Sequence, residues 1–323
     1  MLPLDRRIGD FHSINYIYHS RLHTTGIVHT LRDTHQTQNV VANQKRGKNK
    51  TLDMPKRIFI TGASTGLGKA AAKLFASKGW SVIATMRKPE KENELNKLEN
   101  VALLPLDVTN VEQVKLASEK AIKIGPIDVV FNNAGYGLAG PFEGTTDEQL
   151  IRQLNTNLLG VMRVTQSFIP HFREKKSGLF ITTTSIGGLI TFPFNSVYHA
   201  TKWGLEGWSE SLAFELNPFG IGVKTVSPGG IATDFGGRSL DLASHEAYTE
   251  SVQSVMSVFM DPERQKNYST AEQIAEVVFE AATDGKQKLR YPAGEDAKTM
   301  HEQRNLVGDE KFREGIKATF LAR

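Results

Sequence analysis

Three polar side chains stand in the apolar-rich segment SIGGLITFPFNSVYHATK at residues 185–202. Tyr198 and Lys202 are four residues apart, so on a helix they lie on one face and can approach each other. A free tyrosine has a pKa of about 10, and a nearby ammonium group favours the phenolate and lowers that pKa. Ser185, thirteen residues before the tyrosine, offers a hydroxyl for the same substrate oxygen. The trio predicts proton transfer to or from a carbonyl or alcohol oxygen.

A glycine-rich turn, TGASTGLG at 61–68, stands between an expected strand and an expected helix. Its three glycines let the backbone turn tightly and approach a pyrophosphate, while the helix N-terminus supplies free N–H groups and a partial positive charge. We therefore expect a dinucleotide to contact six residues of this turn. They are Gly62, Ser64, Thr65, Gly66, Leu67 and Gly68.

A P-loop is the weaker interpretation of the same turn. Five residues separate Gly62 from Gly68, whereas a P-loop has four, and Ala70 after Lys69 has no hydroxyl for magnesium. ATP or GTP hydrolysis is therefore disfavoured.

The end of the second expected strand bears on the choice between NAD(H) and NADP(H). NAD-specific folds place an acid there to hold the ribose 2′-hydroxyl, but Met86, Arg87 and Lys88 occupy this neighbourhood. An arginine can pair with a 2′-phosphate. NADP(H) is therefore preferred over NAD(H), and a solvated basic turn is the alternative.

The elements around these residues alternate between short apolar strands and helical patterns. Strands are expected at 56–61, 81–86, 101–108, 127–135, 178–185, 220–230 and 288–294. Helices are expected at 69–79, 92–100, 110–125, 146–173 and 197–216. Continuous apolar strands that alternate with helices predict an α/β fold of Rossmann type, with a doubly wound parallel sheet of about seven strands and helices on both faces of a single domain.

Two segments depart from this alternation. Residues 232–268 are expected to form a loop with short helices over the substrate. Residues 1–53 contain five of the nine histidines and show no sustained periodicity, so we expect a disordered extension before a catalytic domain at 54–323. A transit peptide, or a start codon assigned too early with Met54 as the working start, are the alternatives; a secretory signal is disfavoured because an apolar core is lacking.

Composition narrows the classes of function. The chain has 39 basic and 35 acidic residues, and residues 1–53 contain eight and four of these, which leaves 31 of each in 54–323. A balanced body disfavours nucleic-acid binding. The chain has no cysteine, which excludes disulfides and thiolate chemistry, and its histidine spacings match no metal pattern, so we expect no metal. Without an apolar run long enough to span a bilayer, a cytoplasmic protein is expected.

Taken together, the motifs of residues 56 to about 291 resemble the short-chain dehydrogenase/reductase family. They are TGASTGLG, LDV, NNAG, NTNLLG, Ser185, YHATK and SPGG. The resemblance implies Tyr198 as the catalytic acid/base, Lys202 as the residue that lowers its pKa and binds the nicotinamide ribose, and Ser185 as the group that orients the carbonyl. It implies that Asn157 holds a water that links Lys202 to solvent. Asn157 is chosen over Asn155 because the family's asparagine precedes xxG.

The resemblance also assigns contacts with the rest of the cofactor. Besides Tyr198 and Lys202, these are Asp107 and Val108 at the adenine, Asn133, Ala134 and Gly135 at the central ribose region, and Pro228, Gly229, Ile231 and Thr233 at the nicotinamide and its phosphate. One departure weakens the NADP(H) assignment, because many members that use NADP carry a basic residue before the second glycine of the turn and this chain has Thr65.

The segment from 185 to 213 looks like the branch that contains hydroxysteroid and retinol dehydrogenases, which implies a lipophilic alcohol or carbonyl substrate. Met256, Phe259 and Met260 fit an apolar ligand and could equally pack in the core, whereas His199 is expected to face away from the catalytic side. Members of the family commonly form homodimers or homotetramers through helices that correspond to 146–173 and 197–216.

Two other functions remain as alternatives. An epimerase or dehydratase of the extended relatives would need a larger C-terminal substrate domain than this chain has. A non-catalytic protein that senses NADP(H) would keep the fold, but such proteins typically lose the tyrosine or the lysine.

Overall fold

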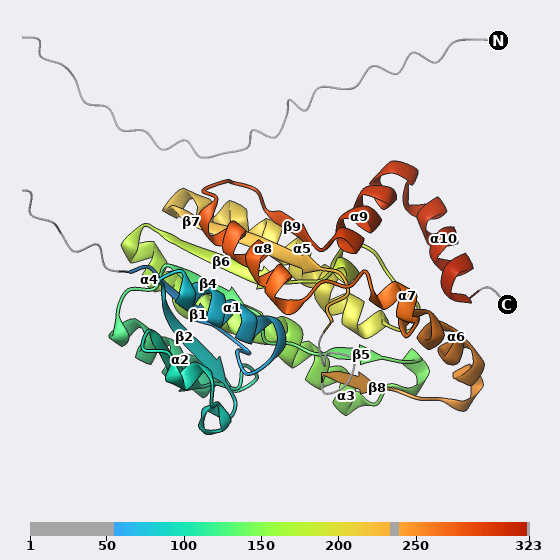
Figure 1. Cartoon of the computed structure of the whole chain (residues 1–323), viewed down its shortest axis with the longest axis horizontal. Helices are drawn as coiled ribbons and strands as arrows, with labels where there is room; N and C mark the ends of the chain where they lie inside the picture. Colours follow the sequence, from blue (N-terminus) through green and yellow to red (C-terminus); the bar gives the residue numbers. More distant parts are fainter. Residues whose placement is uncertain (1–54, 233–238, 322–323) are drawn as a thin grey trace, which may run out of the picture. The chain divides into compact units, whose positions relative to one another are not determined.

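The computed structural model describes residues 55–232 and 239–321, and a seven-stranded parallel sheet forms its centre (Figure 1). The strands are β1 (Arg57–Ile60), β2 (Ser81–Met86), β3 (Val101–Pro105), β4 (Val129–Asn132), β6 (Gly178–Thr183), β7 (Ile221–Pro228) and β9 (Arg290–Ala293). Their order is β3-β2-β1-β4-β6-β7-β9, so the winding reverses between β1 and β4. The predicted doubly wound sheet of seven strands is confirmed.

Helices cover both faces of this sheet. On one face lie α1 (Gly66–Ser77) and α8 (Ala271–Thr283), and on the other lie α2 (Val111–Ile124), α4 (Gly160–Lys175) and α5 (Ser196–Leu216). Successive side chains of a strand point to opposite faces, so Ile58 and Ile60 of β1 pack into the first core while Phe59 packs into the second. This explains why the strands are continuously apolar.

Two predicted helix boundaries are confirmed by the residues that cap them. The Asn110 side chain accepts a hydrogen bond from the Gln113 N–H at 3.0 Å and so caps α2, as expected. Gly79 follows α1 with a φ of +80°, a left-handed conformation that glycine adopts without strain.

The prediction of a helix at 92–100 is wrong. Only a single 3₁₀ turn, Leu95–Lys97, forms there. The Glu92 carboxylate accepts the N–H groups of Glu94 at 2.9 Å and Leu95 at 3.0 Å, which stabilises a local turn, and β3 starts at Val101. The segment is therefore too short for a regular helix.

The long helix expected at 146–173 exists, but it is interrupted. It consists of α3 (Asp147–Leu154), a π-helical segment (Asn155–Leu159) and α4, which extends to Lys175. A π segment widens the helix by one residue per turn and is common at functional sites. Here it carries Asn157.

The described part of the segment 232–268 contains the expected short helices and, in addition, a short strand that was not predicted. It includes β8 (Leu240–Leu242), which pairs in parallel with β5 (Gly137–Ala139), and the helices α6 (Thr249–Phe259) and α7 (Pro262–Gln265). Three further helices were not predicted: α8 and the two C-terminal helices, α9 (Glu295–Val307) and α10 (Asp309–Leu321).

Aromatic contacts join α6 and the loop before α5 to the C-terminal helix α10. The rings of Phe192, Phe259 and Phe320 contact one another, with centroid distances of 5.0 to 5.5 Å. Phe259 thus packs against α10, whereas Met260 is exposed. The loop before α5 is therefore covered by α6 and α10.

The predicted N-terminal extension, 1–53, lies outside the described residues. Within the part of the chain that the structure describes, no helix has the length and apolar character required to cross a bilayer.

Candidate active site

Four parallel strands, β1, β4, β6 and β7, bring the predicted site residues to one edge of the sheet. The glycine turn follows β1, Asn133–Gly135 follows β4, Ser185 follows β6, and the segment from Pro228 to Ile231 ends and follows β7. The carboxyl ends of parallel strands share one edge, and the winding reverses between β1 and β4, where ligands bind in open α/β sheets. Sequence segments up to 170 residues apart thus meet at this edge.

The Ser185 hydroxyl lies beside the Tyr198 phenol, close enough to influence its pKa. The Ser185 hydroxyl oxygen also accepts the Gly187 N–H at 3.0 Å, which fixes it at the start of a 3₁₀ turn, Ile186–Gly188. Burial raises the pKa of the Tyr198 phenol, and the Ser185 hydroxyl opposes this effect. The spacing to Lys202 suggested a lowered pKa, but desolvation outweighs the neighbouring groups.

Lys202 lies one turn after Tyr198 on α5 and is only 6% exposed. Its ammonium donates a hydrogen bond to the Thr183 carbonyl at 2.9 Å and lies 5.7 Å from the centre of the Tyr198 ring. Burial lowers the pKa of Lys202 to about 8, and the negative charge of Glu206 acts in the opposite direction. A lysine with this pKa is mostly charged at pH 7 and loses its charge as the pH rises through about 8.

Asn157 is buried in the π segment beside Lys202. Its side-chain amide donates to the Tyr136 carbonyl at 2.8 Å and its oxygen accepts the Tyr136 N–H at 3.0 Å. A Cβ at Gly135 would lie 3.1 Å from the Asn157 oxygen and 3.9 Å from the Lys202 nitrogen. The structure therefore brings Asn157, Gly135 and Lys202 together.

The glycine turn approaches β4 so closely that side chains would not fit. Gly62 has a φ of +68°, and a Cβ there would lie 2.8 Å from the Ala134 Cα. A Cβ at Gly68 would collide with the Gly62 carbonyl and lie 2.6 Å from the Asn133 amide nitrogen. At Gly66, by contrast, no described atom is within 4 Å of a Cβ position.

The N-terminus of α1 is suited to an anion. Thr65 is its N-cap but makes no side-chain capping bond, and the first turn has no acidic residue, within the described chain. Among the other helices, α2, α3 and α8 are capped by side chains, whereas α5, α6 and α9 are not. The first N–H groups of α1 are therefore available to a phosphate. A nicotinamide dinucleotide fits this cradle.

Thr61 holds the ends of β1 and β4 together, and sequence reasoning did not single it out. Its hydroxyl accepts the N–H groups of Asn133 at 2.9 Å and Ala134 at 3.0 Å. The Asn133 side chain in turn donates to the carbonyls of Thr61 and Gly62 at 3.2 and 3.3 Å. The position of Thr61 at the end of an expected apolar strand, directly before the glycine turn, is the feature of the sequence that could have indicated this role.

The residues expected near the ribose 2′-phosphate and the adenine follow β2 and β3. Arg87 follows β2 and is exposed, and the described residues provide it with neither an ion pair nor a hydrogen bond. Asp107 accepts the N–H and hydroxyl of Thr109 at 2.9 and 2.7 Å, which orders the turn after β3. Val108 is buried against Gly160, where a Cβ would lie 2.8 Å from its methyl group.

The residues expected at the nicotinamide follow β7. The Gly229 N–H donates to the Ala293 carbonyl at 3.0 Å, and the Gly230 N–H donates to the Asp296 carboxylate at 2.7 Å. Ile231 forms an isolated parallel bridge with Ser269. Thr233 lies outside the described residues.

His199 is structural, as expected. Its Nδ1 donates to the Gly187 carbonyl at 2.6 Å and its Nε2 accepts the Phe192 N–H at 2.8 Å. Burial lowers the pKa of this imidazole, so it stays neutral. It ties the turn that follows Ser185 to α5.

Comparison with known proteins agrees with this arrangement. The family described as short chain dehydrogenase matches residues 56–241. An uncharacterized oxidoreductase of Schizosaccharomyces pombe is 38% identical over 238 residues, which cover 73% of this chain and 97% of the relative. Retinol dehydrogenase 8 of Bos taurus is 33% identical over 218 residues, which cover 65% of this chain and 70% of the relative.

Solved structures show the same fold. A short-chain dehydrogenase from Streptomyces avermitilis superposes with a TM-score of 0.72 at 31% identity, over 82% of this chain and 98% of that one. The protein ElxO with NADP bound has a TM-score of 0.64 at 27% identity, over 76% of this chain and all of that one.

Proposed function

Because this chain belongs to the short-chain dehydrogenase family, we propose that it is an NADP(H)-dependent oxidoreductase that interconverts an alcohol and a ketone or aldehyde. The observation that carries the proposal is that the Ser185 hydroxyl lies beside the Tyr198 phenol, with Lys202 one helical turn away at the edge where the glycine turn lies. A phenol, a hydroxyl and an ammonium in this arrangement can handle one substrate oxygen.

The proposed roles follow from the surroundings of each side chain. The nicotinamide, when bound, supplies or accepts the hydride. Ser185 donates a hydrogen bond to the substrate oxygen, and Tyr198 gives its proton to that oxygen during reduction. The raised pKa keeps the Tyr198 phenol protonated near neutrality, which suits an acid. Lys202 provides positive charge beside the phenolate that this transfer leaves.

The cofactor proposal rests on two features of the chain. The uncapped N-terminus of α1, with Gly62, Ser64, Gly66 and Leu67 around it, would hold the pyrophosphate. Arg87 is free to pair with a 2′-phosphate. The NADP-bound relative ElxO supports NADP(H) over NAD(H).

A lipophilic substrate is proposed because aromatic side chains surround the loop before α5. The aromatic side chains are those of Phe192, Phe259 and Phe320, which pack against one another. The similarity to retinol dehydrogenase 8 also supports an apolar alcohol or carbonyl compound as the substrate.

Assembly into a homodimer or homotetramer through α4 and α5 belongs to the same proposal. Phe214 on α5 is 76% exposed, and covering it would remove apolar surface from water. Sedimentation would test the assembly, and cell fractionation would test the expected cytoplasmic location.

Replacement of the phenol tests the proposed chemistry. We expect Tyr198→Phe to lower kcat at least 100-fold in carbonyl reduction while NADPH still binds, since only the proton donor is lost. Tyr291→Phe is the matched control and should retain turnover, because the Tyr291 hydroxyl binds Asp284 away from Ser185 and Lys202. Near-normal turnover by Tyr198→Phe would contradict the mechanism.

A non-catalytic sensor of NADP(H) is the alternative. Absorbance of the reduced nicotinamide, followed with a panel of lipophilic and small carbonyl compounds, separates the two. Tight NADPH binding without oxidation by any compound of the panel would favour the sensor.

A further inference from the structure

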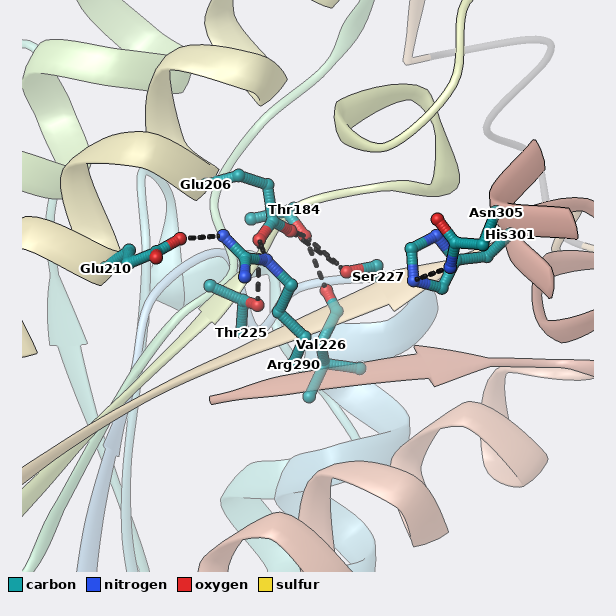
Figure 2. A network of polar contacts seen from close by, with 9 residues as sticks. All are labelled: Thr184, Glu206, Glu210, Thr225, Val226, Ser227, Arg290, His301 and Asn305. Carbon is teal, nitrogen blue, oxygen red and sulfur yellow. Dashed lines mark hydrogen bonds and ion pairs between the residues drawn. The ribbon is translucent and has the colours of Figure 1, made fainter. Parts of the chain in front are cut away.

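Figure 2 shows a buried carboxylate, Glu206, surrounded by hydrogen-bond donors. Glu206 is 3% exposed. One carboxylate oxygen accepts the hydroxyls of Thr184 at 2.5 Å and Ser227 at 3.0 Å, and the other accepts the Thr225 hydroxyl at 3.2 Å and the Arg290 Nε at 2.9 Å. Four donors, one of them a guanidinium, stabilise the ionised carboxylate. A buried negative charge is thus held in a fixed place.

The Glu206 carboxylate is linked to the segments that carry the candidate catalytic residues Lys202 and Ser185. Glu206 follows Lys202 by four residues on α5, so both side chains lie on one face of the helix. Its partner Thr184 stands between Thr183, whose carbonyl accepts the Lys202 ammonium, and Ser185. Glu206 therefore joins α5 to the strand end that holds both Lys202 and Ser185.

The packing around this stretch leaves little freedom. A Cβ at Gly188 would lie 2.9 Å from the Lys202 carbonyl oxygen and 3.2 Å from the Glu206 Cγ. The turn after Ser185 is therefore packed directly on the helical turn between Lys202 and Glu206. A shift of the carboxylate would move the groups on both sides.

We propose that Glu206 is a positioning residue that keeps Lys202 charged and in register with Ser185, and that Arg290 limits this effect by partly neutralising the carboxylate. The inference rests on the proposed function for its catalytic meaning. Burial disfavours the Lys202 ammonium, and the nearby negative charge of Glu206 offsets part of that penalty. Glu206 itself need not touch substrate or cofactor.

The other charged groups near Lys202 leave Glu206 as the main opposing charge. On α5 itself, the other titratable side chains are Tyr198, His199, Glu210 and Glu215. His199 is bonded to Gly187 and Phe192, Glu210 is exposed and pairs with Arg290, and Glu215 is exposed. Among described residues, β5, β6, the 3₁₀ turn after Ser185 and the π segment carry no titratable side chain. The elements β7 and α3 contribute Lys224, which binds Asp284; Arg152, which binds Asp241; and the exposed Asp147 and Glu148.

Two substitutions with opposite expected signs test the proposal. Glu206→Gln keeps the size of the side chain and removes its charge, so the Lys202 pKa should fall from about 8 by about one unit. In carbonyl reduction, kcat/KM falls at alkaline pH as Lys202 loses its charge. This alkaline limb of the pH profile should move to lower pH by the same amount. Arg290→Gln removes the neutralising charge, so the limb should move to higher pH. Glu206→Asp, which restores the charge, should recover much of the wild-type profile.

The matched control is Glu210→Gln. Glu210 also pairs with Arg290 but is exposed and lies one turn further from Lys202, so its removal should leave the limb in place. NMR of protein with isotope-labelled lysine, assigned with Lys202→Arg, follows the Lys202 titration without any turnover.

The outcomes separate this inference from the proposed function. An active wild-type enzyme with an unchanged Lys202 titration in both Glu206→Gln and Arg290→Gln would overturn the role of Glu206 alone. An inactive wild-type protein would overturn the proposed function, while the NMR titration would still decide the role of Glu206. If Glu206→Gln fails to fold, the upward shift in Arg290→Gln supports the proposal and its absence overturns it.

Discussion

At the carboxyl end of β2, the exposed Arg87 guanidinium is available to an anion, whereas Lys69 and Lys73 of α1 are already engaged. Lys69 binds Glu92 at 3.2 Å and Glu94 at 2.5 Å, and Lys73 binds Glu94 at 2.5 Å. Arg87 has no such partner among the described side chains. A 2′-phosphate would therefore meet Arg87 rather than these lysines.

We expect Arg87→Ala to raise the Kd for NADPH about tenfold or more, because a charge-assisted and potentially bidentate contact is lost. The Kd for NADH should change little, because NADH lacks the 2′-phosphate. Fluorescence titration with both cofactors measures the difference. Lys97→Ala is the control, because Lys97 is also an exposed cation but is not among the residues expected to contact the cofactor. An equal increase in Kd for NADPH and NADH would mean that Arg87 does not bind the 2′-phosphate.

At the scale of single residues, spacing predicted which side chains meet but not what burial does to them. The four-residue interval between Tyr198 and Lys202 placed both on one face of α5, and Ser185 was found from the end of its strand. Spacing could not show that desolvation raises the Tyr198 pKa, because burial depends on distant segments. Glu206 escaped notice for the same reason, since a glutamate in a helix usually faces solvent.

At the scale of elements, the meeting of β1, α1 and β4 depends on Gly68. Gly68→Ala should lower the free energy of unfolding by about 1–3 kcal/mol and weaken cofactor binding, since the added methyl collides with the Gly62 carbonyl. Gly207→Ala is the matched control, because no described atom lies within 4 Å of a Cβ there on α5. Alanine should stabilise that helix by up to about 1 kcal/mol. Chemical unfolding of both variants gives the comparison, and an equal effect of both would refute the close approach.

Element prediction succeeded where local signals agreed with tertiary packing. The Asn110 cap and the apolar strands are such cases. The segment 92–100 has helix-forming residues, but Glu92 bonds the backbone locally and β3 begins at once. The π segment at Asn155–Leu159 was not predicted, because a count of helical periodicity assumes one regular period of 3.6 residues along the whole helix.

At the scale of the whole molecule, the C-terminal helices could not be predicted because their partners are remote. α9 is predominantly polar, with Ala297 buried, and α10 buries Phe312 and Phe320. Phe320 packs against Phe192, which stands 128 positions earlier in the chain. A short amphipathic segment shows its apolar face, but not the surface that receives it.

Acid stability is the property of the whole molecule that the structure predicts most directly. The Lys224 ammonium, buried in β7, lies 2.6 Å from Asp284, and the Tyr291 hydroxyl donates to the same carboxylate at 2.7 Å. Burial alone would raise the pKa of Asp284, but the hydrogen bonds from Lys224, the Lys286 N–H and Tyr291 lower it to about 2. A carboxyl group with a lowered pKa stabilises the fold above its unfolded pKa of 3.8, and this stabilisation is lost as the pH falls towards 2.

Asp284→Asn should therefore lower the free energy of unfolding at pH 7 by on the order of 1 kcal/mol, after allowance for solvent screening. The difference from wild type should shrink as the pH falls from 4 to about 2, because the wild-type carboxyl group then becomes protonated too and leaves Lys224 equally unpaired. Urea unfolding of both proteins between pH 7 and pH 2 measures the difference at neutral pH and its decrease at acid pH. Asp309→Asn is the control, since Asp309 pairs with Arg304 at the surface and an exposed pair contributes little at any pH. A gap for Asp284→Asn that stayed constant from pH 7 to pH 2 would show that the carboxylate charge is not what stabilises this end of the sheet.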